Sequence, residues 1–207
     1  MVKYYTSTAL FKYTWDQVAI ALWQRYPNPY SKHVLSEDVV HREVINGKLY
    51  TKRLLTKTNP MPRWGEHFVR GPRHICVVEE SIVDPKNKSL TTYTRNIGMQ
   101  KLLTIIEKCD YIQNPENLRT TQCNRWAWFQ SSLYGFRRAL QAFGVERYKS
   151  NVTKNVKGFN TTLEQLFVTD IPQQTKTKQK LKEKAKHAVD LAKSKTQPLL
   201  TSSSQLP

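Results

Sequence analysis

Residues 38–57 read DVVHREVINGKLYTKRLLTK, in which apolar and polar side chains alternate on both sides of Asn46-Gly47. Alternation with a period of two is typical of a β-strand that has one covered face. Asn-Gly is the dipeptide best suited to a type I′ turn, because both residues tolerate a positive φ. This stretch therefore predicts a β-hairpin whose second strand runs from Lys48 to Lys57.

The second strand of this hairpin carries two cations among its leucines. Because side chains alternate along a strand, Arg53 and Lys57 share one face with Leu49 and Leu55. The spacing leaves open whether this face is covered or is an ordinary solvated face.

Further strand-like and helical segments surround the hairpin. Strands are expected at residues 73–83, 89–97, 101–113 and 118–130, and helices at residues 14–26 and 133–168. The first helix begins with a capping box formed by Thr14 and Gln17, and short turns between successive strands favour an antiparallel meander. The sequence therefore predicts an α+β domain over residues 1–171, with a meander followed by one long helix.

The chain of 207 residues has a formal net charge of +17, and this charge is not confined to one segment. Residues 172–207 are rich in lysine and predict a conditionally helical or disordered tail, but the preceding residues are also strongly basic. Such a surface attracts polyanions, so nucleic acid, anionic lipid and acidic proteins are all candidate partners. Charge alone does not choose among them.

Motifs that would carry catalysis or hold a metal are missing from the sequence. It has no glycine-rich phosphate loop, no GxSxG and no HExxH, so we expect neither an enzyme nor a catalytic residue. Cys76, Cys109 and Cys123 form no CxxC pair and predict neither a disulfide framework nor a zinc site. There is no secretory signal, and no apolar run is long enough to span a membrane.

Three aromatic residues near the end of the meander raise a second functional class. Trp126, Trp128 and Phe129 stand among basic residues and could form a stacking platform for nucleic acid. No motif of an established RNA- or DNA-binding module supports this alternative.

The segment Trp23-Gln-Arg-Tyr-Pro-Asn-Pro-Tyr-Ser-Lys-His-Val-Leu35 holds two cationic side chains on stiff backbone. Pro27 and Pro29 fix their own φ and bias the preceding residues away from the helical region. Arg25 and His33 therefore lie on a rigid exit from the first helix. The segment is either a helix-terminating loop with solvated cations or one wall of a binding site.

The long helix has an apolar stripe that becomes polar part of the way along. Arg147, Asn151 and Lys154 continue the line of Phe136, Leu140 and Phe143 at helical spacing. The polar trio is either the solvated back of the helix or the cationic mouth of a cavity whose deep part is apolar.

The connection from Asn59 to Gly71 is unusually rich in large apolar side chains. Met61, Trp64, Phe68 and Val69 are costly to expose to water. They either pack onto the core or form a lid, a membrane-touching loop or a partner site.

Taken together, the sequence from Met1 to about Phe167 resembles the PRELI-domain family. The most specific segments are the Trp23–Leu35 stretch, Arg53-Leu-Leu-Thr-Lys, Pro62-Arg-Trp and Lys149-Ser-Asn-Val-Thr-Lys. The resemblance implies a steroidogenic-acute-regulatory-like fold, in which a curved antiparallel sheet is closed by the C-terminal helix around a lipid cavity.

The resemblance also implies a function and a set of residues. It implies transfer of a phospholipid, chiefly phosphatidic acid with phosphatidylserine as the alternative, across the mitochondrial intermembrane space to supply cardiolipin synthesis. The implied head-group residues are Arg25, His33, Arg53, Lys57, Arg147, Asn151 and Lys154, and the implied lid and membrane contacts are Met61, Trp64, Phe68 and Val69.

The partners implied by the resemblance are a small twin-CX9C helical protein and anionic mitochondrial membranes, with no metal, no cofactor and no nucleic acid. A nucleic-acid-binding module, and an adaptor that acts through the basic tail, remain the alternatives from other functional classes.

Overall fold

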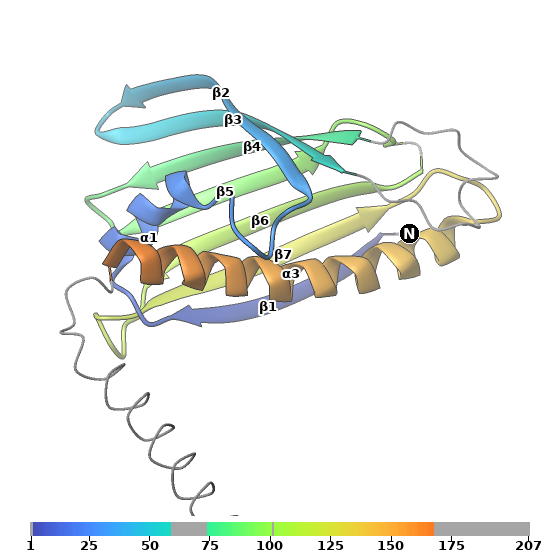
Figure 1. The fold of residues 1–207 in the computed structure, drawn as a ribbon. Helices are drawn as coiled ribbons and strands as arrows, with labels where there is room; N and C mark the ends of the chain where they lie inside the picture. The colour runs from blue at the N-terminus through green and yellow to red at the C-terminus, as the bar shows by residue number, and fades with distance from the viewer. Residues whose placement is uncertain (1, 59–73, 101, 168–207) are drawn as a thin grey trace, which may run out of the picture. The chain divides into compact units, whose positions relative to one another are not determined.

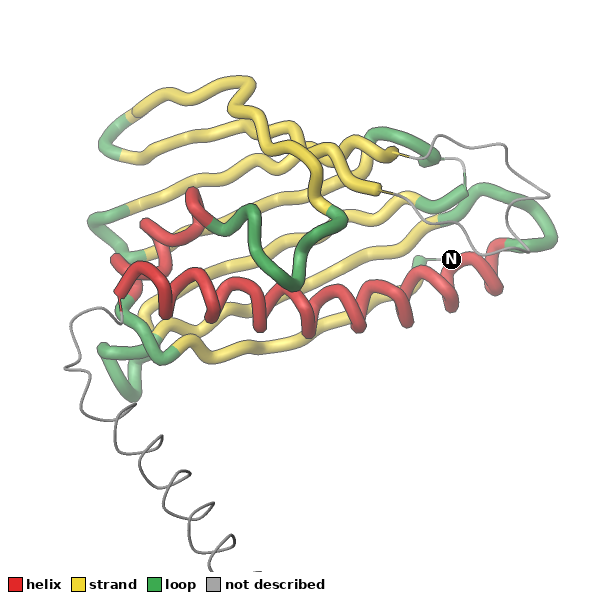
Figure 2. Tube along the Cα trace, in the orientation of Figure 1, coloured by secondary structure: helices red, strands yellow, loops and turns green. Residues whose placement is uncertain are grey.

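The computed structural model describes residues 2–58, 74–100 and 102–167. Seven strands form one antiparallel sheet in the order β1-β7-β6-β5-β4-β3-β2. Their bounds are β1 Lys3–Phe11, β2 Val34–Ile45, β3 Lys48–Thr58, β4 His74–Asp84, β5 Ser89–Asn96, β6 Thr104–Gln113 and β7 Thr121–Gln130. The helices α1 (Trp15–Ala21) and α3 (Arg137–Phe167) pack on one face of this sheet (Figures 1 and 2), and the short 3₁₀ helix η1 (Leu22–Gln24) continues α1.

The hairpin that opens the meander forms as the sequence predicts. Asn46 has φ 50° and Gly47 has φ 75°, the two positive values that a type I′ turn requires. On β3, Thr51, Arg53 and Leu55 are buried while their neighbours are partly exposed. The face that carries Arg53 is therefore the covered face, which answers the question that spacing left open.

Strand β1 is the element that the local sequence pattern does not reveal. It pairs with β7 from Lys3 opposite Phe129 to Phe11 opposite Thr121, and so adds an edge strand after the last strand of the meander. The partner strand is more than a hundred residues away in sequence, so no adjacent turn marks the pairing.

Several predicted element ends move inward for identifiable reasons. Helix α3 begins at Arg137 rather than at residue 133, because Gly135 has φ 78° and so breaks the helical backbone before it. Strand β7 begins at Thr121 rather than at 118, because the preceding residues form a turn closed by the Asn114 amide donating to the carbonyl of Thr120 at 3.0 Å.

The N-terminal helix also divides where its sequence changes. The capping box is present, with the amide of Thr14 donating to Oε1 of Gln17 at 2.9 Å. The helix passes into η1 at Leu22, and the chain then leaves through Tyr26–Pro27, whose peptide bond is cis. The helical structure thus ends just before the proline-rich exit.

Two apolar clusters lie on the helix-covered face of the sheet, and a polar belt separates them. One cluster joins α1, the carboxyl-terminal half of α3 and the sheet: Phe11, Trp15, Val18, Leu22, Leu90, Tyr111, Phe159 and Leu163. The other joins the middle of α3 to β6 and β7: Ala127, Phe129, Tyr148, Val152, Leu103 and Ile105. The polar belt consists of two cross-strand rows between them: Arg53, Glu79, Thr94 and Glu107, and Thr51, Ser81, Thr92, Cys109 and Arg125.

Some predicted features lie outside the described residues. These are the four lid residues, Met61, Trp64, Phe68 and Val69, and the basic tail at 172–207. In the part of the chain that is described, no helix is both long enough and apolar enough to cross a bilayer.

Candidate functional site

A cavity of about 240 Å³ lies between the amino-terminal half of α3 and strands β3 to β6. Most of its wall is apolar: Ile75, Val77, Met99, Leu102, Leu103, Ile105, Leu140, Phe143 and Val152. Gly144 brings the helix close to the β5–β6 connection, since a Cβ on it would lie 2.5 Å from Cδ2 of Leu103. The volume is below the roughly 300–1,000 Å³ of pockets that enclose drug-sized ligands, so a larger ligand either extends beyond the cavity or displaces part of its wall.

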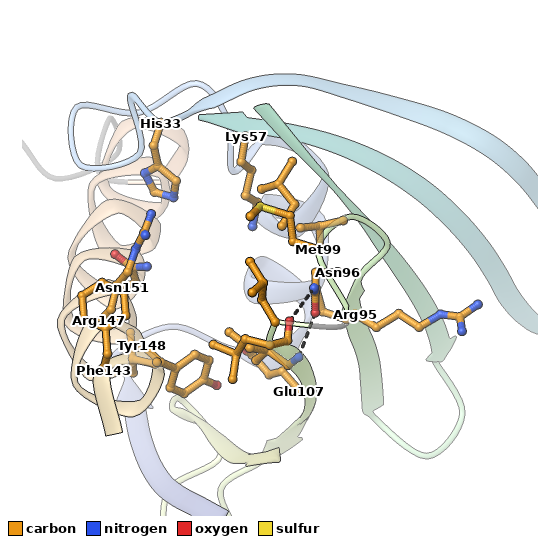
Figure 3. A pocket seen from close by; sticks show the side chains of 18 of the residues that line it. His33, Lys57, Arg95, Asn96, Met99, Glu107, Phe143, Arg147, Tyr148 and Asn151 are labelled. Atoms are coloured by element: carbon orange, nitrogen blue, oxygen red, sulfur yellow. Dashed lines mark hydrogen bonds between the residues drawn. The ribbon is translucent and has the colours of Figure 1, made fainter. Parts of the chain in front are cut away.

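One side of this cavity is polar and is built from three separate elements. His33 lies just before β2, Lys57 lies near the end of β3, and Arg147 and Asn151 lie one turn apart on α3; all four line the cavity. Figure 3 shows their side chains gathered on the same side of it. The backbone carbonyl of His33 accepts the amide of Thr58 at 2.8 Å, which fixes the first segment beside the second.

The charges around this polar side are dominated by cations. Burial lowers the pKa of His33, and the positive charges of Lys57, Lys154 and Arg147 lower it further. Burial also lowers the pKa of the Arg147 guanidinium, which still keeps its charge at neutral pH. Such a neighbourhood disfavours one more positive charge and favours an anion.

The lowered pKa of His33 has a definite consequence for stability. Between the unfolded pKa of about 6.5 and the lower folded pKa, the unfolded chain binds more protons, so stability falls as the pH falls through this window. We expect His33→Gln to remove this pH-dependent contribution to stability. Between about pH 7 and about pH 5, the free energy of unfolding of the variant should therefore change less than that of the wild type. Urea titrations at the two pH values measure the difference, and His41→Gln on the exposed part of β2 is the control. Equal pH dependence in wild type and His33→Gln would contradict this reading of the site.

Two of the predicted head-group residues lie elsewhere, in a buried ion-pair cluster. Nη2 of Arg25 donates to Oε2 of Glu79 at 2.8 Å, and Arg53 bonds to both Glu79 and Glu37. The Arg53 side chain is only 1% exposed and its guanidinium lies 4.9 Å from the ring centroid of Trp23. Arg25 and Arg53 are therefore matched by carboxylates, and neither is among the described residues that line the cavity.

The shared carboxylate of this cluster is strongly perturbed. Burial by itself raises the pKa of Glu79, but attraction to Arg25 and Arg53 and hydrogen bonds from both outweigh burial and lower the pKa to about 2. Glu79 is thus ionised at every physiological pH and holds the two arginines together.

Lys154, the last of the seven predicted residues, is exposed on α3 and does not line the cavity. It is still close enough to His33 to lower the pKa of that side chain. The structure therefore brings together four of the seven residues, places one beside them and puts two in the ion-pair cluster.

Other residues that line the cavity were not predicted from the sequence. Glu107 lines the cavity, pairs with Arg125 at 3.2 Å and accepts the Cys109 thiol at 2.9 Å. The period of two on β6 places Glu107 on the covered face with Ile105 and Cys109, and that was the available signal. Tyr148 also lines the cavity, and burial, followed by the charge of Glu107, raises its pKa.

The three aromatic residues that suggested nucleic-acid binding do not share a face. Phe129 is fully buried beneath α3, whereas Trp126 and Trp128 alternate to the opposite side of β7. There Trp128 lies 5.8 Å from Tyr4, and the ammonium of Lys108 lies 5.3 Å from Trp126. Within residues 2–58, 74–100 and 102–167, no group of three His, Cys, Asp or Glu side chains could hold a metal ion.

Comparisons with known proteins agree with this architecture. A family model described as the PRELI-like family matches residues 16–169. PRELI domain-containing protein 1, mitochondrial, from Gallus gallus is 51% identical over 196 residues, which are 93% of this chain and 88% of the relative. Protein UPS1, mitochondrial, from Saccharomyces cerevisiae is 32% identical over 174 residues, which are 84% of this chain and 99% of the relative.

Solved structures share the fold at low sequence identity. A protein from Thermus thermophilus aligns with a TM-score of 0.56 at 15% identity, over 80% of this chain and 99% of that one. An aromatase/cyclase from a Streptomyces species aligns with a TM-score of 0.55 at 11% identity, over 79% of this chain and 94% of that one. The predicted fold class, a curved antiparallel sheet closed by a long C-terminal helix in the steroidogenic-acute-regulatory-like class, is confirmed.

Proposed function

Because this chain belongs to the PRELI-like family, we propose that it is a mitochondrial lipid transfer protein, and not an enzyme, that carries one phospholipid at a time through the intermembrane space. The cargo we propose is phosphatidic acid, delivered to the inner membrane for cardiolipin synthesis. We also propose that the chain works as a heterodimer with a small twin-CX9C helical protein and needs no cofactor.

One observation carries this proposal: the cavity joins an apolar wall to a cationic side. Burying acyl chains is favourable by about 0.8 kcal/mol per CH₂, which supplies a reason for a lipid to enter. Moving the anionic head group out of water costs free energy and offsets this gain, unless cations and hydrogen-bond donors of the protein bind the head group. Lys57, Arg147, Asn151 and His33 can do so from three directions.

The excess of positive charge on this side of the cavity favours phosphatidic acid over phosphatidylserine. A phosphomonoester has a second pKa of about 6 and so carries between one and two negative charges, and a planar guanidinium such as that of Arg147 binds it through two parallel hydrogen bonds. Phosphatidylserine has a phosphodiester with a single negative charge, and its serine adds a carboxylate together with an ammonium, which the cations that lower the pKa of His33 would repel.

Transfer between vesicles tests this function. We expect the full chain, purified with its partner, to move phosphatidic acid from donor to acceptor vesicles about tenfold faster than phosphatidylserine, and to release phosphatidic acid when the complex is extracted for mass spectrometry. Transfer of neither lipid, together with nucleic-acid binding that survives physiological salt, would favour the nucleic-acid alternative. Normal transfer after removal of residues 172–207 would exclude an adaptor role of the tail as the main activity.

A further inference from the structure

Exposed apolar side chains gather where two connections leave the sheet. Tyr134 is 94% exposed and Phe136 43% exposed in the β7–α3 connection, and Ile97 is 47% exposed in the β5–β6 connection. Because Thr104 at the start of β6 pairs with Gln130 at the end of β7, both connections leave the same end of the sheet (Figure 1). Together they form an apolar rim at this end of the domain.

This rim adjoins the cavity. Met99 and Leu103 from the β5–β6 connection line the cavity wall, and so do Leu140 and Phe143 from the first turns of α3. Gly135 has φ 78°, so the chain turns sharply there and Tyr134 projects from the turn. A surface seated on this rim would therefore lie directly beside the cavity.

Among the described residues around these two connections, the exposed charged side chains are cationic. Arg137 and Arg138 follow Phe136 directly and are exposed, and the exposed Lys3 and Arg95 lie at the same end. The sequence has no Asp or Glu in residues 2–15, 95–106 or 125–145.

The opposite end of the sheet carries charges of both signs. Asp84 at the end of β4 pairs with Lys48, and Asp16 in α1 pairs with Lys88. The β6–β7 turn likewise holds Glu116 and Arg119.

Aromatic rings followed by arginines fit the interface of an anionic bilayer. Tyrosine is favoured at the level of the lipid head groups, where its ring is in an apolar layer and its hydroxyl in water. Arginine side chains beside it can extend along apolar surface and bind lipid phosphates. A nucleic acid offers no layer for the aliphatic Ile97.

We propose that residues 131–138 are a membrane-docking surface, which inserts Tyr134 and Phe136 among the head groups of an anionic bilayer while Arg137 and Arg138 bind lipid phosphates. This proposal rests on the proposed lipid transfer function in one respect: that function explains why docking is useful, because docking would place the cavity against the membrane that supplies the lipid.

Vesicle binding of matched variants tests the surface. Vesicles of phosphatidylcholine and phosphatidylglycerol are anionic but contain no phosphatidic acid, so they measure docking without cargo. We expect Tyr134→Ser with Phe136→Ser to lower the partition coefficient of the full chain about tenfold, and Arg137→Gln with Arg138→Gln to lower it about thirtyfold at low salt.

The control is a pair of the same residue classes at the opposite end of the sheet. Leu118→Ser with Arg119→Gln changes one exposed apolar and one exposed cationic side chain in the β6–β7 turn. We expect its partition coefficient to remain within about twofold of the wild type. An equal loss in the control pair, or no loss in either docking variant, overturns the proposal.

Hydrogen exchange of the unmodified chain provides a readout that does not depend on a variant. The amides of residues 131–138 should become protected when the vesicles are added, while those of residues 114–120 should not. Protection of 131–138 by an acidic protein or a nucleic acid, but not by vesicles, overturns the bilayer as the occupant. If the unmodified chain transfers phosphatidic acid but does not bind the vesicles through residues 131–138, this surface alone is rejected. If it docks on the vesicles but transfers no lipid, the proposed function alone is rejected.

Discussion

The substitution Glu79→Gln is expected to lower the free energy of unfolding by about 3–5 kcal/mol. The glutamine side chain would keep the size of the glutamate but remove the negative charge that Arg25 and Arg53 share. Two buried guanidinium groups would then face each other, with Glu37 as the remaining carboxylate of the cluster. Because a whole domain is stable by only about 5–15 kcal/mol, this loss is a large part of the total.

The neighbouring residue provides a matched control. Glu80 points to the opposite face of β4 and pairs with Lys52 at the surface, where the two side chains are 53% and 44% exposed. Glu80→Gln should therefore cost no more than about 1 kcal/mol in the same urea titration. Equal losses for the two substitutions would mean that the cluster is not held by its buried charge.

The pH dependence of the same variant gives an independent check. The folded pKa of Glu79 is about 2, below the ordinary value of 4.5, so its contribution to stability is complete above the ordinary value and is lost as the pH falls toward 2. In Glu79→Gln this acid-dependent component should be absent. The contribution of His33 begins to be lost below the ordinary pKa of about 6.5, where that of Glu79 is still complete, so one series of titrations shows where each begins.

The second large effect is expected on transfer rather than on stability. Arg147→Glu should slow the transfer of phosphatidic acid by at least about a hundredfold, because it removes one charge-assisted contact and adds a charge that repels the phosphate. Arg147 lines the cavity on the amino-terminal half of α3 and is half-buried, so we expect the fold to persist.

The control for this experiment lies on the same helix. Lys157→Glu makes the same change in net charge at an exposed position outside the cavity lining. We expect it to reduce transfer by no more than about threefold, through weaker long-range attraction to anionic vesicles. If both variants lose transfer equally, overall charge and not a head-group contact accounts for the effect.

The position of Arg25 changes which experiment is informative. From the sequence, Arg25→Glu would be expected to abolish transfer and leave the fold intact. Because Arg25 is bonded to Glu79, a glutamate at position 25 would instead place two carboxylates together in the buried cluster. Loss of transfer in that variant would report unfolding as readily as loss of head-group binding.

The parts of the fold that the sequence predicts are those with a local physical cause. Asn46-Gly47 encodes its turn, and Thr14 and Gln17 encode the start of α1, within a few residues of chain. Strand β1 has no such local signal, because its pairing with β7 is a contact between the two ends of the domain. The later start of α3 depends on the positive φ of Gly135. Glycine permits a positive φ but does not require one, so the sequence does not determine where this helix begins.

The candidate site divides in the same way. Helical spacing placed Arg147, Asn151 and Lys154 on one face of α3, and in the structure the first two line a cavity while Lys154 is exposed outside its lining. Spacing could not separate Arg53 from Lys57, which share a face of β3, because the difference lies in their cross-strand neighbours. Arg53 stands opposite Glu79, which neutralises it, and Lys57 stands opposite Ile75, which does not.

Helix α3 is held unequally along its length. In its carboxyl-terminal half, Phe159 and Leu163 are in the core, and Gly158 approaches the proline-rich segment so closely that a Cβ would lie 2.4 Å from Oδ1 of Asn28. The amino-terminal half instead borders the cavity. We therefore expect expansion around a large ligand to displace the amino-terminal half of α3 more than the carboxyl-terminal half. Because Tyr148 and Val152 also pack on the sheet, such a movement would exchange contacts of the second apolar cluster for contacts with the ligand, while the first cluster keeps the domain folded.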